Sequence, residues 1–313
     1  MYTYVLNVQT DNNANNLYQD KVKELGFGTR AIHIGQEPDP STGAVIPSIS
    51  LSTTYKQSAI GVHKGYEYSR SNNPNRSAFE ESIASLEKGK YALAFSSGSA
   101  VTATIVTSIG TNGHIISVDD VYGGTNRYFT KVAGTQGIEA TFVNLHDPKN
   151  IEGAFKHNTK IVWIETPTNP TLRLVDIRAV ANITHQHNAI LVYISVTKYI
   201  NGHSDVVMGV AIMNDEEIYN KIKFLQNAIG AIPSSFDSWL ASRGLKTLHL
   251  QSHPQHILAK KQARGFGGML LNLWNIVTAV GVTDNLIRLS IGIEDVDDLL
   301  EDIQQALDIA VQD

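Results

Sequence analysis

Short apolar runs alternate with helical segments between Tyr91 and Ile212, and this alternation limits the possible folds more than any other feature of the chain. The runs have the length of buried strands, and the segments between them carry apolar residues at helical spacing. Such an alternation is typical of an α/β fold with a mostly parallel sheet and helices on both of its faces. The expected strands are Tyr91–Phe95, His114–Val118, Glu139–Asn144, Lys160–Ile164, Ala189–Ile194 and Val206–Ile212, and the expected helices are Ser77–Lys88, Val101–Ile109, Asp176–His187, Glu216–Ile229 and Phe236–Leu250.

Small and polar residues follow several of these strands. Ser97-Gly98-Ser99 comes directly after the first strand, where a helix is expected to begin. Small residues in a strand-to-helix turn expose backbone N–H groups at the helix N-terminus, and the helix dipole favours an anion there. Tyr122, Asn169 and Lys198 follow three other strands. Because ligand sites in such sheets lie at the carboxyl ends of the strands, we predict one site that combines these residues.

Lys198 follows the apolar run Ala189–Ile194, and two hydroxyl residues, Ser195 and Thr197, lie close to it. An ammonium group at the end of a buried strand loses hydration, which lowers the pKa of the amine and makes it available as a base or a Schiff-base nucleophile. The two hydroxyl groups could hold a phosphate. Together these features indicate pyridoxal phosphate (PLP), although a surface lysine in a strand-to-turn connection is an alternative that these residues alone leave open.

Other side chains suit the same chemistry. Tyr68 and Arg70 lie in a turn-rich loop, where an arginine fork can clamp a phosphate or simply be solvated. The ring of Tyr122 could stack on a heteroaromatic ring or pack within its loop. Arg288 lies inside the expected strand Asn285–Gly292 and requires a carboxylate partner, which is either a substrate or a structural salt bridge.

Composition narrows the function further. The net charge of −5 is spread without long runs, so nothing points to nucleic acid or to an anionic membrane. The 313 residues include no cysteine, which excludes a disulfide framework and a cysteine-based zinc site. His249, His253 and His256 are not expected to bind a metal, because Pro254 breaks the helix that would align them. Without a signal-peptide pattern or an apolar stretch of membrane-spanning length, we expect a cytoplasmic protein.

The first part of the chain differs from the rest. Met1–Asp20 is polar and Asn-rich without sustained periodicity, and we predict a mobile extension. Gly28–Lys56 contains Pro47 and many Ser and Thr residues, which indicates an extended arm rather than a core element.

The segment from Ser195 to Gly209 resembles the lysine segment of the PLP-dependent enzymes of cysteine and methionine metabolism, the trans-sulfuration family, and the resemblance extends over most of the chain from about Gly28 onward. It implies PLP fold type I, the aspartate aminotransferase-like α/β fold with a mostly parallel sheet flanked by helices, followed by a reduced C-terminal α+β domain. The implied organisation is the mobile extension and N-terminal arm over residues 1–65, a PLP-binding large domain over residues 66–248 and the C-terminal domain over residues 249–313.

The resemblance also implies roles for the candidate residues. Lys198 would hold the cofactor and move protons, and Tyr122 would stack over the cofactor ring and assist catalysis. Tyr68 and Arg70 would bind the cofactor phosphate of the adjacent subunit, so that a dimer or tetramer shares its active sites. The remaining implied assignments are Gly98, Ser99, Ser195, Thr197 and Asn169 for the cofactor, and Arg288, Asn169 and Glu165 for the amino-acid substrate.

The implied activity is that of a carbon–sulfur lyase that cleaves cystathionine to cysteine, 2-oxobutanoate and ammonia. Residues 199–204 and 227–233 favour this lyase over the cystathionine gamma-synthase and homoserine sulfhydrylase reactions of the same family. A truncated homologue without catalytic activity is the alternative from another class of protein.

That alternative arises because the chain lacks internal blocks of the family at three junctions: Val192-Tyr193, Leu250-Gln251-Ser252, and the stretch between Leu271 and Gly281. At the first, the family has a strand ending in Asp-Asn-Thr-Phe, a loop and a second strand that leads to the lysine, whereas Ala189–Ile194 stands here for both. The missing aspartate keeps the pyridine nitrogen of PLP protonated, which makes the ring an electron sink. We therefore expect a sheet that lacks one strand, weak PLP affinity and low activity.

Overall fold

The computed structural model describes residues 2–6, 25–168, 171–195, 200–203, 205–249, 300–301 and 304–305. The chain divides into two compact units, Met1–Leu248 and His249–Asp313. In the second unit, residues 300–301 and 304–305 are helical and His249 lies in a turn. The expected strand around Arg288 lies outside the described residues.

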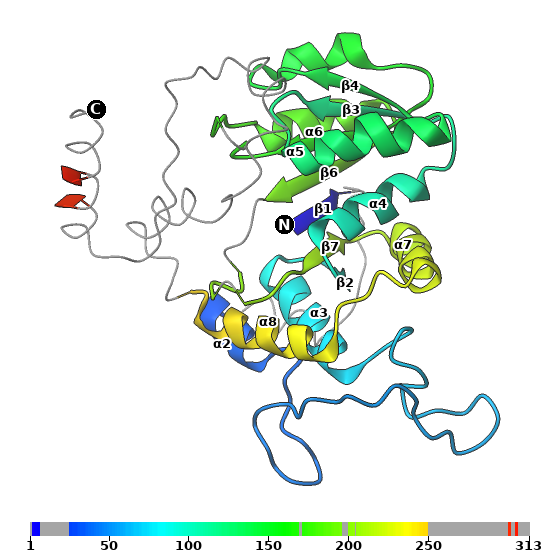
Figure 1. Cartoon of the computed structure of the whole chain (residues 1–313), viewed down its shortest axis with the longest axis vertical. Helices are drawn as coiled ribbons and strands as arrows, with labels where there is room; N and C mark the ends of the chain where they lie inside the picture. Colours follow the sequence, from blue (N-terminus) through cyan, green and yellow to red (C-terminus); the bar gives the residue numbers. More distant parts are fainter. Residues whose placement is uncertain are drawn as a thin grey trace. The chain divides into compact units, whose positions relative to one another are not determined.

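A seven-stranded sheet forms the centre of the first unit, with the order β2-β7-β1-β6-β5-β3-β4 (Figure 1). Strands β2 to β6 run in one direction, and β1 and β7 run in the opposite direction. The prediction of a mostly parallel sheet is therefore confirmed. The strands are β1 Tyr2–Leu6, β2 Tyr91–Phe95, β3 His114–Val118, β4 Glu139–Val143, β5 Thr159–Glu165, β6 Ile190–Ser195 and β7 Gly209–Met213.

Helices cover both faces of the sheet, as the alternation of elements predicts. They are α2 Phe27–His33, α3 Pro74–Leu86, α4 Gly98–Ser108, α5 Gly123–Arg127, α6 Ile177–Gln186, α7 Glu216–Ile229 and α8 Ser235–Thr247, with short η segments at Tyr128–Val132, Ala133–Gln136 and Pro148–Ala154.

Alternate residues of β2 and β7 enter two different hydrophobic cores, because successive side chains of a strand point to opposite faces. One core contains Ile105 of α4 and Ile222 of α7, and the other contains Phe79 of α3 and Leu245 of α8. The strand residues are Leu93, Phe95, Ala211 and Met213 in the first core and Ala92, Ala94, Val210 and Ile212 in the second.

Two predictions about the N-terminal part are wrong. Tyr2–Leu6 is not part of a mobile extension but forms β1 in the interior of the sheet, between β6 and β7 (Figure 1). The sheet therefore has seven strands, one more than the six expected from the sequence. The arm expected over Gly28–Lys56 begins within a helix, α2, and only the part after it is irregular, with isolated bridges at Thr54–Tyr68 and Ala59–Val62.

Candidate active site

The carboxyl ends of β2, β3, β5 and β6 lie at one edge of the sheet, because these strands are parallel to one another. The α4 turn follows β2, Tyr122 follows β3, and Glu165 and Ser195 are the last residues of β5 and β6. The structure thus brings these four parts of the predicted site to a common edge, where ligand sites of open α/β sheets are found.

The turn before α4 presents the N-terminus of an 11-residue helix to this edge. Ser97 caps the helix, because its side chain accepts a hydrogen bond from the backbone N of Ala100 at 3.1 Å. Gly98 and Ser99 are the first two helical residues, and N–H groups at such positions have no intrahelical acceptor. Gly209, at the start of β7, packs so closely that an added Cβ would lie 2.6 Å from the carbonyl O of Ser97. The turn is therefore closely packed rather than a free loop, and a helix start of this kind has N–H groups that could bind an anion.

Tyr122 is half-buried, and burial raises the pKa of its phenol, which is consequently neutral near pH 7. Its backbone N donates a hydrogen bond to Oε2 of Glu165 at 2.9 Å, which joins the ends of β3 and β5. A Cβ on Gly124 would lie 2.5 Å from Cε1 of the tyrosine ring. Because Gly124 has no side chain, it leaves room for the ring of Tyr122.

Glu165 is fully buried, and burial raises the pKa of its carboxyl group to about 8. The hydrogen bond from the Tyr122 backbone opposes this rise, and the nearby Asp120 adds to it. Oε1 of Glu165 has no hydrogen-bond partner among the described residues. Near pH 7 the group is therefore mostly a neutral carboxylic acid at the edge of the site.

Asp120 was not a candidate in the sequence, yet it organises the loop after β5. Its Oδ2 accepts hydrogen bonds from Oγ1 of Thr168 at 2.7 Å and from the backbone N of Thr171 at 3.2 Å. The backbone N of Val175 also donates to Oγ1 of Thr166 at 3.1 Å. The available signal was an aspartate two residues before Tyr122 and two residues after the end of a buried strand.

Tyr68 and Arg70 lie in the connection between α2 and α3. Nη1 of Arg70 donates to the carbonyl O of Asn227 at 2.9 Å, and its guanidinium carbon lies 5.6 Å from the centre of the Tyr68 ring. None of the hydrogen bonds described for these two residues reaches Gly98 or Ser99. Their role in the site of an adjacent subunit stays a prediction.

Several predicted site residues cannot be placed. Asn169, Thr197, Lys198 and Arg288 lie outside the described residues. Ser195 is placed by its backbone alone, as the last residue of β6. No group of three or more His, Asp or Glu side chains in the described ranges could hold a metal ion, and no helix there is long and apolar enough to cross a membrane.

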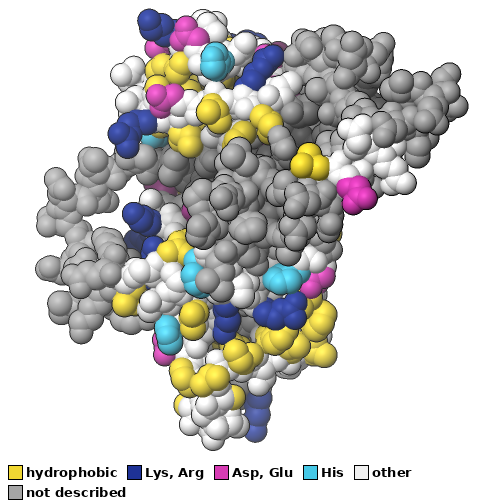
Figure 2. All heavy atoms as spheres, turned by 90° about the vertical axis from the view of Figure 1, so that its left-hand side faces the viewer, with side chains coloured by type: hydrophobic (Ala, Val, Ile, Leu, Met, Phe, Trp, Pro, Cys, Tyr) yellow, Lys and Arg dark blue, Asp and Glu magenta, His cyan; other side chains and the backbone are white. Residues whose placement is uncertain are grey.

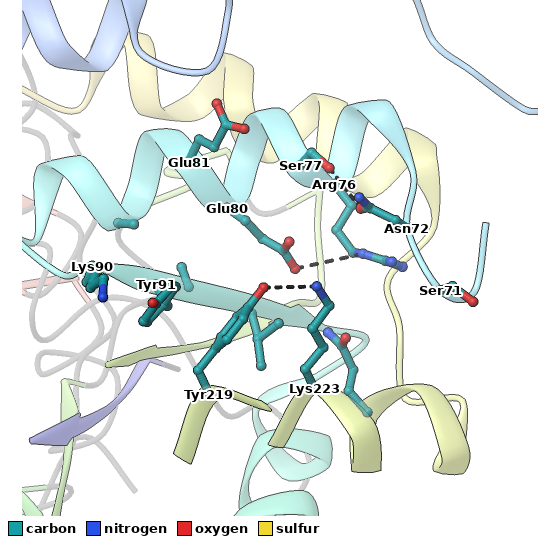
Figure 3. Close-up of a pocket in the computed structure, with 14 residues that line it drawn as sticks. Ser71, Asn72, Arg76, Ser77, Glu80, Glu81, Lys90, Tyr91, Tyr219 and Lys223 are labelled. Atoms are coloured by element: carbon teal, nitrogen blue, oxygen red, sulfur yellow. Dashed lines mark hydrogen bonds and ion pairs between the residues drawn. The ribbon is translucent and has the colours of Figure 1, made fainter. Parts of the chain in front are cut away.

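A polar pocket of about 220 Å³ lies outside this edge, between α3, β2 and α7 (Figure 3). Oε1 of Glu80 accepts from the backbone N of Ala94 at 2.7 Å and lies 3.8 Å from Nε of Arg76, and Lys223 donates to the Tyr219 hydroxyl at 3.1 Å. Burial raises the pKa of Glu80 to about 7, against the effect of Arg76. Glu80 and Lys223 are thus bound to neighbouring groups, which is typical of a structural network.

The family model of "Cys/Met metabolism PLP-dependent enzyme" matches residues 28–194, 186–251 and 275–308. The chain belongs to this family. A cystathionine gamma-lyase of Dictyostelium discoideum is 43% identical over 90% of this chain and 97% of its own. Among solved structures, metB from Corynebacterium glutamicum has a TM-score of 0.80 at 33% identity, covering 92% of this chain and 99% of that one. Cystathionine gamma-lyase from Lactobacillus plantarum, solved with L-serine, has a TM-score of 0.79 at 30% identity, covering 90% and 98% of the two chains.

The matches confirm that blocks are missing inside the chain. The alignment with the Dictyostelium relative is 377 residues long, whereas 90% of 313 residues is about 282. The family model matches residues 186–194 twice, at the end of one block and at the start of the next, and it leaves residues 252–274 unmatched. One stretch, which includes most of β6, therefore stands where the family has two.

PLP is the cofactor of this family, and the described residues fit it in two respects. The N-terminus of α4 offers N–H groups for a phosphate. The half-buried ring of Tyr122 can cover a flat heteroaromatic ring. For the pyridine nitrogen, the aspartate that the resemblance implies has no counterpart in the sequence, and Asp120 is already bound to Thr168 and Thr171.

Proposed function

We propose that this chain is a PLP-dependent carbon–sulfur lyase that cleaves cystathionine to cysteine, 2-oxobutanoate and ammonia. The observation that carries the proposal is the 43% identity to a cystathionine gamma-lyase over 90% of the chain. The sheet edge supports it, because the turn before α4 and Tyr122, which the resemblance implies for the phosphate and the cofactor ring, follow strands that end at the same edge.

The residues of the proposed site have separate roles. When bound, PLP withdraws electrons from the carbon atoms of the substrate that lose protons. Gly98 and Ser99 hold the phosphate through backbone N–H groups, with the hydroxyl groups of Ser195 and Thr197. Tyr122 orients the cofactor ring.

Lys198 takes up and returns protons at Cα and Cβ of the substrate before the bond from Cγ to sulfur breaks, and Tyr122 assists in this transfer. Asn169 and Arg288 position the amino-acid substrate, Arg288 through the α-carboxylate. Glu165 lies close to the substrate and keeps Tyr122 in place through its backbone.

The site is completed by a second copy of the chain, through Tyr68 and Arg70. The connection between α2 and α3, which carries these residues, exposes several apolar side chains, and this is unusual for a surface that stays in water. Figure 2 shows hydrophobic side chains gathered toward the lower end of the molecule, the end at which Figure 1 places the connection between α2 and α3. The exposed apolar residues of this connection include Val45, Ile46, Leu51, Ile60 and Val62.

Light scattering of the purified chain tests the assembly. We expect at least a dimer, and Arg70→Ala should weaken PLP binding with little effect on the mass of the particle. A monomer that binds PLP normally would contradict the shared site.

The domain limits of residues 1–65, 66–248 and 249–313 and a cytoplasmic location belong to the same proposal. Limited proteolysis tests the limits, with cleavage expected near residues 65 and 248. Cell fractionation tests the location, which a cysteine-free chain suits because reducing conditions do not affect it.

The release of 2-oxobutanoate from cystathionine tests the activity. We expect slow release by the chain with excess PLP, none by Lys198→Ala, and unchanged release by Lys149→Ala, which alters an exposed lysine. Equal release by the chain and by Lys198→Ala would refute the proposal. Faster formation of cystathionine from an O-activated homoserine and cysteine would instead identify a synthase.

A further inference from the structure

The strands β6 and β7 are not neighbours in the sheet, although β7 follows β6 in the chain. Each of them pairs with β1, which is antiparallel to β6 and parallel to β7 (Figure 1). All five residues of β1 pair with β6, from Tyr2 opposite Ser195 to Leu6 opposite Leu191. Four of them also pair with β7, from Tyr2 opposite Val210 to Val5 opposite Met213.

We propose that Tyr2–Leu6 replaces the strand that the shortened connection after Val192 leaves out. The slot between β6 and β7 is then a strand-acceptor site, and its occupant is the N-terminal segment of the same chain. The segment suits the slot because Tyr, Thr and Val favour strands. The residues that follow in the sequence are polar and Asn-rich, a composition that does not favour a strand.

The direction of β1 supports a replacement rather than an ordinary connection. A strand that followed β6 through a crossover would run parallel to it, as β5 and β6 do. β1 runs the opposite way and comes from the other end of the chain. Without it, the inner edges of β6 and β7 would leave backbone groups unpaired among fully buried neighbours such as Val192 and Ala211.

The length of chain beyond β1 favours an occupant from the same molecule. Residues 7–24 join β1 to the first described residue of the arm, and a chain of this length can extend to roughly 60 Å, longer than an ordinary domain is wide. A tether of this kind gives a local concentration on the order of millimolar. A strand from a second copy would have to compete with that concentration.

A disulfide cross-link tests the register directly, because the chain has no cysteine of its own. Val5 lies opposite Val192, and opposed Cα atoms of antiparallel strands are about 4.5–5.5 Å apart, within the range of a disulfide. The pair Val5→Cys and Val192→Cys should form an intramolecular disulfide under mild oxidation. In the control pair, Val5→Cys and Leu191→Cys, the register is shifted by one residue, so the two cysteines lie on opposite faces of the sheet.

Peptide mapping and non-reducing electrophoresis distinguish the outcomes. Cross-linking at least tenfold faster in the in-register pair, within one chain, supports the proposal. Equal rates in the two pairs would overturn it, and so would a disulfide that joins two copies.

Hydrogen exchange of a chain lacking residues 2–6 gives a second test. We expect exchange at least tenfold faster in β6 and β7, with less change in β4, which does not touch the slot. Unchanged exchange in β6 and β7 would mean that they pair directly with each other, and the proposal would fail. If the shortened chain does not fold, the cross-link decides.

Competition tests the replacement itself. A family-like strand-loop-strand block inserted between Val192 and Tyr193 supplies the omitted strand. In the chain with Val5→Cys and Val192→Cys, this insertion should lower the cross-linking rate at least tenfold, because β1 is displaced. An unchanged rate would show that β1 does not occupy the place of that strand.

Discussion

Glu165 should make the stability of the chain depend on pH, and Glu165→Gln should remove that dependence. The carboxyl group is fully buried, and its pKa rises from 4.5 to about 8. Between these two values the folded state holds a proton that the unfolded state has lost, so the free energy of unfolding falls as pH rises. The contribution is complete below pH 4.5 and is lost above about pH 8. At about 1.4 kcal/mol for each factor of ten in proton affinity, the whole effect is about 5 kcal/mol, an upper limit for a group that relaxes on ionisation.

Urea unfolding at pH 6 and at pH 9 measures this effect. The loss due to Glu165 between these conditions is about 3 kcal/mol, because part of the contribution is already gone at pH 6. Glutamine has nearly the shape of the neutral acid and keeps an oxygen that accepts from the Tyr122 backbone. The variant should therefore match the parent chain at pH 6 and exceed its stability at pH 9. Parallel pH profiles of the two proteins would refute the reasoning about burial.

Three further predictions concern the surroundings of the site. Gly124→Ala should displace the Tyr122 ring and weaken PLP binding by at least tenfold in an absorbance titration. The control Gly134→Ala should leave binding unchanged, because a Cβ added there meets nothing within 4 Å. Equal PLP affinities of the two variants would refute this role of Gly124. Asp120→Ala should destabilise the chain by about 2–4 kcal/mol in urea unfolding, because buried donors of the loop after β5 lose a charged acceptor; a loss below about 0.5 kcal/mol would contradict it. Because the pKa of Glu80 is about 7, its carboxyl group should make the free energy of unfolding fall as pH rises from 4.5 to 7. Glu80→Gln should flatten the pH dependence of the free energy of unfolding in that range. An unchanged slope of this dependence would count against the assignment.

Most strands of the sheet could be predicted from the sequence because each is a short apolar run between turn residues. The expected strands Tyr91–Phe95 and His114–Val118 have the observed bounds, and the helix Glu216–Ile229 does as well. These elements depend on local pattern, and burial on both faces makes the pattern strong. The common edge of the site also follows, because parallel strands end on the same side.

β1 could not be predicted in the same way. Tyr2–Leu6 is a single short run beside polar residues, and its partners are far away in the sequence, at Leu191–Ser195 and Val210–Met213. The run is only five residues long and leads into an Asn-rich polar stretch, so the local pattern gave no clear strand signal. Asp120 could not be predicted either, because its structural role comes from a hydrogen bond to a loop that lies 48 residues further along the chain.

The central claim is that PLP binds covalently at the edge formed by the ends of β2, β3, β5 and β6. The most direct measurement is borohydride reduction of the chain with PLP, followed by peptide mass spectrometry. We predict that the label is attached to Lys198 and that Lys198→Ala abolishes it. A label on another lysine, or no label with PLP in excess, would contradict the account.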